Sequence, residues 1–211
     1  MRELTCEQVK NMLLYVADQV IESKPYLTEV DSQIGDGDHG IGMAGGMKKA
    51  SDVLSKLSEN DNAYFYFQEM GKAMLMSMGG ASGVIFGTMF MGGAKGKEAS
   101  AVLSIPAFTT LMADSLNQIK IRGKAQVGDK TMVDALEPAV LAMQAYAGDS
   151  FVELLDAATA AAAQGVENTK QYQAKFGRSK SLLERAIGFQ DAGATSVWII
   201  FRSMAEFVKK A

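Results

Sequence analysis

The sequence predicts an all-α fold, built from about eight main helices in one domain over residues 1–211. Apolar residues recur at helical spacing along most of the chain. No pair of alternating apolar runs flanks an Asn-Gly or Asp-Gly hairpin turn, and only three prolines interrupt the pattern. A length of 211 residues fits one domain, and an apolar fraction of 48% is enough to bury a core.

The first helix is marked by a capping-box pattern, in which Thr5 precedes Gln8 by three residues. Apolar residues then repeat on one face: Val9, Met12, Leu13, Val16, Val20 and Ile21. Further helices are predicted near residues 26–33, 40–58, 63–78, 83–95, 105–122, 131–147, 150–176 and 194–210. The alanine-dense stretch LLDAATAAAAQGV has high helix propensity and permits close approach between helices.

Glycine is unexpectedly frequent for a helical protein, because each glycine inside a helix costs about 1 kcal/mol relative to alanine. Most of the 21 glycines collect between the predicted helices. The clusters are IGDGDHGIG (34–42), MGGASG (78–83), RGKAQVGDK (122–130) and GFQDAGA (188–194). Flexible turns would explain any one cluster. Four clusters, three of them with an aspartate, favour a ligand site at one end of a helix bundle, where backbone N–H groups approach phosphate oxygens.

Asp31, Asp36 and Asp38 form the strongest candidate site. Three carboxylates so close in sequence would repel one another if left unpaired, and a hard divalent cation such as Mg²⁺, Mn²⁺ or Ca²⁺ removes that repulsion. An EF-hand is excluded, because a loop starting at Asp36 places Met47 where a bidentate glutamate is required. Zinc is disfavoured by the single cysteine and single histidine. The alternative is a solvated loop whose acids cap a helix.

Three further features could contact phosphate. His39, the only histidine, could accept a phosphoryl group, bind a phosphate or orient a neighbour, or be an ordinary surface histidine. The MGGASG stretch places Ser82 at a helix N-terminus, which favours anions, although a close packing turn would look the same and no Walker A pattern occurs. Arg178 could clamp a phosphate with two hydrogen bonds or lie in a solvated loop.

Several partner classes are disfavoured. A net charge of −3 without a basic block disfavours nucleic acid and anionic membrane. The uncharged stretch 73–94 is long enough for a membrane span, but its glycines indicate two buried helices joined by a turn. The polar N-terminus lacks the apolar core of a signal peptide, and a lone Cys6 forms no internal disulfide, so a cytoplasmic location is expected.

Four motifs, taken in order, resemble the L subunit of bacterial dihydroxyacetone kinases of the phosphotransferase-system-dependent type. They are GDGDHG (35–40), GGASG (79–83), RGKAQVGDKTM (122–132) and GRSKSLLERAIGFQDAGATS (177–196). Each motif is weak alone, but their order and spacing match over essentially the whole chain. The length also resembles a separate subunit rather than a fused kinase.

The resemblance implies a barrel of eight antiparallel helices with ADP or ATP and two Mg²⁺ ions at one end. The metal ligands would be Asp31, Asp36 and Asp38. The nucleotide-binding residues would be His39, Gly40, Ile41, Gly42, Ala81, Ser82, Gly123, Met132, Arg178, Asp191, Ala192 and Gly193, with Arg178 also the candidate catalytic residue. A phosphohistidine M subunit would rephosphorylate bound ADP, and the γ-phosphoryl group would pass to a ketose on a K subunit. A homodimer is also open.

The chain departs from the family pattern at six positions. Gly42 and Gly45 stand where Asn and Arg are usual, and Ser181, Leu183, Phe189 and Ala192 replace Tyr, Gly, His and Pro. The three metal aspartates are retained, so nucleotide binding is expected to survive these changes. A divergent paralogue that serves another small ketose, such as a tetrulose, would account for them.

Two other functions remain open from the sequence. One is a regulatory module that carries ADP or ATP and is read by a partner without turnover. The other is the related fatty-acid kinase, which has a similar metal motif but is expected to carry further domains. The main hypothesis, a phosphotransferase subunit active only with its partners, is consistent with the absence of a second histidine that could hold a ketose.

Overall fold

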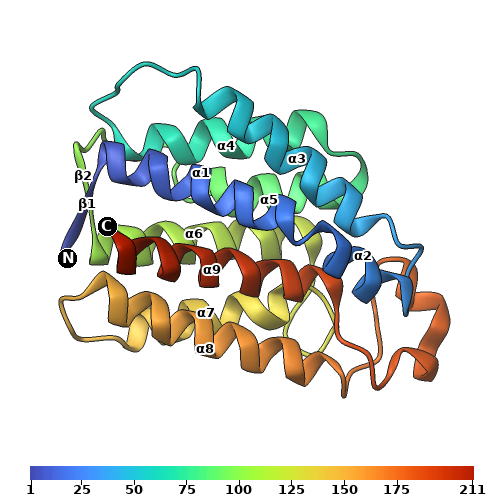
Figure 1. The fold of residues 1–211 in the computed structure, drawn as a ribbon. Helices are drawn as coiled ribbons and strands as arrows, with labels where there is room; N and C mark the ends of the chain where they lie inside the picture. The colour runs from blue at the N-terminus through green and yellow to red at the C-terminus, as the bar shows by residue number, and fades with distance from the viewer.

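The fold is a closed ring of eight helices, and the computed structural model describes residues 1–211 (Figure 1). The ring helices are α1 (Cys6–Glu22), α3 (His39–Leu54), α4 (Ala63–Ser77), α5 (Gly80–Met91), α6 (Ile105–Gly123), α7 (Val133–Ala145), α8 (Phe151–Thr169) and α9 (Ala192–Lys210). They pack in that order, and α9 returns to α1. Successive helices run in opposite directions (Figure 1). The predicted all-α barrel of eight antiparallel helices is therefore confirmed.

Two short helical segments and one small sheet complete the fold. The helix α2 (Lys24–Ser32), which begins with Pro25 in its first turn, and the 3₁₀ segment η1 (Arg178–Ala186) lie at one end of the ring (Figure 1). At the other end β1 (Glu3–Thr5) pairs antiparallel with β2 (Val102–Ser104), beside both chain termini. The sheet was not predicted, because three-residue strands are too short to show alternation.

Most helix boundaries agree with the predictions, and the capping box of Thr5 and Gln8 is formed. Three predicted helices extend too far at their C-terminal ends: 40–58 ends at Leu54, 83–95 at Met91 and 150–176 at Thr169. The helix predicted over 83–95 instead begins at Gly80, directly after a glycine turn that separates it from α4. No helix combines the length and the apolar character needed to cross a bilayer.

The interior of the ring is a single apolar cluster of 53 buried residues. Phe108 of α6 lies between Phe67 of α4 and Phe151 of α8, with ring centroids 6.2 Å and 5.8 Å apart. These three helices do not follow one another around the ring, so the aromatic contacts cross its interior. Such close packing makes the ring a rigid support for the loops at its ends.

Close approach between α7 and α8 depends on Gly165. A side chain at this position would overlap the carbonyl oxygen of Asp134 on α7 and meet the Cα of Ala135 at 2.8 Å. Because both obstacles are backbone atoms, neither can move aside without separating the two helices. Gly45 on α3 differs, since a Cβ there would meet no atom within 4 Å.

We therefore expect Gly165→Ala to lower the free energy of unfolding by about 1–3 kcal/mol through overpacking. Gly45→Ala is the matched control: it should raise that free energy by about 0.5–1 kcal/mol, because an exposed helical glycine gains helix propensity. Denaturant unfolding followed by circular dichroism measures both. Equal stability of the two variants would contradict the close packing of α7 and α8.

Candidate metal and phosphate site

The predicted site residues all lie at the end of the ring that carries α2 and η1 (Figure 1). Because the helices alternate in direction, α3, α5, α7 and α9 begin at this end. Most of the predicted phosphate contacts lie at those helix starts: His39–Gly42 on α3, Ala81 and Ser82 on α5, Met132 before α7, and Asp191–Gly193 at α9. Gly123 is the last residue of α6.

The acidic turn between α2 and α3 brings the three aspartates together. Asp31 lies in the last turn of α2, and Asp38 is the N-cap of α3. Gly37, between Asp36 and Asp38, has a φ of +76°, which a glycine adopts without strain. One carboxylate oxygen from each of Asp31, Asp36 and Asp38 lies within 4.8 Å of the others. The all-oxygen donor set and this spacing fit Mg²⁺, so these three residues would hold the metal.

Arg178 reaches this turn from η1, 140 residues away in sequence. Its guanidinium forms an ion pair with the Asp36 carboxylate and donates a hydrogen bond to Asp38 Oδ2 at 3.1 Å. The Arg178 side chain is 68% exposed, so these pairs add little to stability. Their importance is geometric, because they place a guanidinium beside the carboxylates that would hold the metal.

His39 connects the acidic turn to α9. Its backbone N–H donates to Asp31 Oδ2 at 3.3 Å, and its ring Nε2 lies 2.8 Å from Ser196 Oγ. The ring also packs on Phe86 of α5. Burial lowers the pKa of the imidazole, and the nearby Asp31 and Asp38 carboxylates only partly offset this effect. The imidazole is therefore neutral near pH 7, and its Nε2 is already hydrogen-bonded to Ser196.

The start of α9 is a second turn that contains site residues. Asp191 caps the helix by accepting the Ala194 N–H at 2.7 Å. Burial raises the pKa of this carboxyl to about 7. A side chain at Gly193 would lie 3.4 Å from the Met132 nitrogen, so the turn before α7 and the start of α9 are in contact. Gly123 lies farther along this end, against Ile85 of α5.

Sequence reasoning overlooked the charged residues that build the loop before α7. Asp134 is buried and accepts the Gly128 N–H at 2.6 Å and the Thr131 N–H at 2.7 Å, and burial raises its pKa. Lys130 is also buried. The signal was present in the stretch DKTMVD (129–134), where three charged residues stand within six positions directly before and at the start of a helix.

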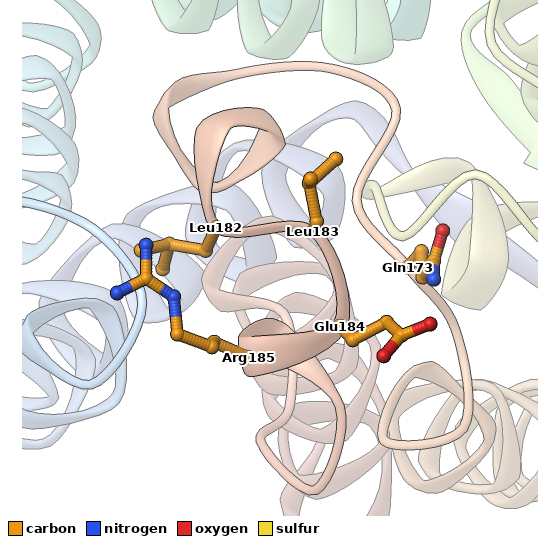
Figure 2. A pocket seen from close by; sticks show the side chains of 5 residues that line it. All are labelled: Gln173, Leu182, Leu183, Glu184 and Arg185. Carbon is orange, nitrogen blue, oxygen red and sulfur yellow. The ribbon is translucent and has the colours of Figure 1, made fainter.

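The segment around η1 has a hollow of its own. Gln173, Leu182, Leu183, Glu184 and Arg185 line a space of ≈ 350 Å³ (Figure 2). Leu183 is exposed and has a left-handed φ of +52°. None of these five residues is a predicted nucleotide or metal contact.

Comparison with known proteins identifies the family. A model of the DAK2 domain matches residues 33–206 of this chain. The chain belongs to the DAK2 domain family. This DAK2 domain is 35% identical over 209 residues to the ADP-binding subunit DhaL of the PEP-dependent dihydroxyacetone kinase of Escherichia coli strain K12, covering 98% of this chain and 99% of that protein. It is also 35% identical to the ADP-binding subunit DhaL of the PTS-dependent enzyme of Lactococcus lactis, covering 90% and 92% of the two chains.

The fold also matches a solved structure. The dihydroxyacetone kinase of C. freundii in complex with AMP-PNP and Mg²⁺ superimposes on this DAK2 domain with a TM-score of 0.73 and 26% sequence identity. The match covers 94% of this chain and 33% of that kinase. This chain therefore corresponds to about one third of the larger enzyme and to nearly all of the separate DhaL subunits.

The geometry of the acidic turn predicts the effect of Asp36→Asn. The substitution removes one ligand charge without changing size, so we expect binding of Mg-ADP to weaken at least tenfold while the helical circular dichroism is unchanged. Isothermal titration calorimetry measures the affinity. Asp52→Asn, at a half-exposed residue paired with Lys48 on α3, is the matched control and should bind as the parent does. An unchanged affinity in Asp36→Asn would remove this residue from the metal site.

Proposed function

We propose that this chain is the nucleotide-carrying subunit of a small-ketose kinase, with residues 1–211 as one functional domain. It binds ADP or ATP with two Mg²⁺ ions and transfers the γ-phosphoryl group to a ketose on a partner subunit. The observation that carries the proposal is the meeting of Asp31, Asp36 and Asp38 at the end where four ring helices begin. The full-length relatives named ADP-binding subunits support the same assignment.

The charge distribution of this end suits a polyphosphate with its metal. The starts of α3, α5, α7 and α9 carry partial positive charge that favours phosphate oxygens, and the aspartates would bind the cations that neutralise the remaining charge. Bound Mg²⁺ would polarise the phosphoryl group and hold the phosphates in line for transfer. The residues proposed to contact the nucleotide are those at the helix starts, together with Gly123 and Arg178.

Arg178 is the proposed catalytic residue. Its guanidinium already lies beside Asp36 and Asp38, next to where the metal-bound phosphates would be. A planar guanidinium can donate two hydrogen bonds to phosphoryl oxygens and stabilise the charge that develops during transfer. For His39 we propose an orienting role rather than that of phosphoryl acceptor, because Ser196 already engages Nε2.

The proposed function requires two partner subunits. A ketose-binding K subunit would hold the acceptor, and a phosphohistidine M subunit would convert bound ADP back to ATP, both in the cytoplasm. The PTS-dependent enzyme named for the L. lactis relative supports this arrangement. A tetrulose is the second candidate substrate, because the D-erythrulose kinase of Mycolicibacterium smegmatis is 31% identical over 201 residues, although this chain covers only 34% of that protein.

Ligand binding to the folded state should raise the free energy of unfolding. At a Mg-ADP concentration 100 times Kd, the free energy of unfolding should rise by about 2.7 kcal/mol. For a chain of this size the melting temperature should then rise by about 5–10 °C. Thermal unfolding with Mg-ADP, after treatment with EDTA, measures the shift. Mg²⁺ with adenosine is the control and should give almost no shift. Insensitivity to Mg-ADP would contradict nucleotide binding.

Transfer should require the second subunit. With ATP, Mg²⁺ and dihydroxyacetone, this chain alone should form almost no ketose phosphate, because correct positioning of an acceptor contributes on the order of 7 kcal/mol. Adding a ketose-binding K subunit should start the reaction, and Arg178→Ala should then lower the rate by roughly 10²-fold or more.

Arg2→Ala, an exposed arginine paired with Asp149 near the N-terminus, is the matched control and should leave that rate unchanged. Efficient phosphorylation by the chain alone would show that it contains a substrate site and would refute the subunit assignment. Binding of Mg-ADP without transfer to any K subunit would favour the regulatory module.

A further inference from the structure

Lys130 is a buried lysine at the site end of the ring. It is 2% exposed and ranks among the largest fully buried side chains of the chain. Its backbone has a left-handed φ of +60°, which is uncommon for a residue with a side chain. A buried charge and a strained backbone at one residue together indicate that the surroundings require this side chain.

The Lys130 ammonium joins two segments that are distant in sequence. Nζ donates to the carbonyl oxygen of Thr169, the last residue of α8, at 2.6 Å, and to that of Phe189 at 2.5 Å. The first contact places a positive charge at the C-terminus of a helix, where the helix dipole favours it. The second contact fixes the backbone at Phe189, two residues before Asp191.

The segment held by Lys130 leads directly into the start of α9. The Asp191 N–H donates to Thr169 Oγ1 at 2.9 Å. Thr169, at the end of α8, therefore binds Lys130 through its carbonyl oxygen and Asp191 through its hydroxyl. Met132, two residues after Lys130, contacts the position of Gly193. The Lys130 side chain and its own loop thus hold the proposed nucleotide contacts at 132 and 191–193 together.

The loop that carries Lys130 is itself fixed by buried carboxylates. Asp134 accepts the N–H groups of Gly128 and Thr131, on the two sides of Lys130. Asp129 accepts the Gln126 N–H at 2.8 Å and pairs with Lys175 at 2.6 Å. These contacts fix the loop that presents the lysine.

We propose that Lys130 is a positioning residue for the bound nucleotide: its ammonium fixes the turn 189–193 against α8 and Met132, so that the start of α9 is preformed for the phosphates. The inference rests on the proposed function. Lys130 does not contact the acidic turn in the structure and acts through Thr169 and Phe189. Burial lowers the pKa of the ammonium, and the Asp191 and Asp134 carboxylates partly offset this effect.

The test is Lys130→Met in the full chain, which keeps the buried length and removes the charge and both hydrogen bonds. We expect Mg-ADP affinity by calorimetry to fall at least tenfold. Binding of Mn²⁺ alone, followed by electron paramagnetic resonance, should change less than threefold, because α2 and α3 hold the aspartates. Hydrogen exchange should accelerate at the amides of residues 188–194. Lys130→Arg, which keeps the charge, should recover part of the affinity.

Leu103→Ala, a buried residue of β2 at the opposite end, is the control for general destabilisation and should leave Mg-ADP affinity unchanged well below its melting temperature. If folded Lys130→Met binds Mg-ADP within threefold of the parent, the inference is overturned and the proposed function stands. If the parent itself does not bind Mg-ADP, both are overturned.

A variant that keeps the lysine covers the case in which Lys130→Met does not fold. Thr169→Val preserves volume and removes the acceptor of the Asp191 N–H. It should weaken Mg-ADP binding at least threefold and accelerate exchange at the same amides. Parent-like Mg-ADP binding and parent-like exchange in Thr169→Val would overturn the inference.

Discussion

The alternating direction of the helices around the closed ring determines at which end each helix start, and therefore each predicted site residue, lies. With eight helices, each antiparallel to both neighbours, four helices must begin at each end. At the end carrying the acidic turn, the starts of α3, α5, α7 and α9 bring unpaired N–H groups and partial positive charge together. That end is suited to an anion, and the carboxylates of Asp31, Asp36 and Asp38 add the capacity to hold its counter-cations.

The ring supplies rigidity, whereas the connecting segments supply chemistry. The continuous apolar core and backbone contacts such as Gly165 against Asp134 fix the helices relative to one another. The segment from the end of α8 to the start of α9 is held differently, by Lys130, by the Lys175–Asp129 pair and by the contact of Arg178 with the acidic turn. Of the three cationic side chains, only Lys130 is buried, so its contacts are the ones that solvent and salt weaken least.

This arrangement explains how a DAK2 domain could carry a nucleotide without a complete active site. The carboxylates proposed to hold the metal, the helix starts and Arg178 all lie at one end, and each could act on phosphates. Under the proposed function, transfer to an acceptor on a second protein would use what the fold provides. This chain covers about one third of the D-erythrulose kinase of M. smegmatis and of the dihydroxyacetone kinase of C. freundii, which are longer polypeptides.

Local sequence determined the helices, their approximate number and the composition of the acidic turn, because periodicity, caps and a GDGDHG turn are properties of neighbouring residues. Family resemblance, rather than periodicity, predicted the closed barrel. Helix ends at Leu54 and Thr169, and the sheet between β1 and β2, depended on contacts that no short window contains. Only the tertiary structure placed Arg178 on Asp36, and Lys130 between Thr169 and Phe189, because closure of the ring brings together segments that are tens to more than a hundred residues apart.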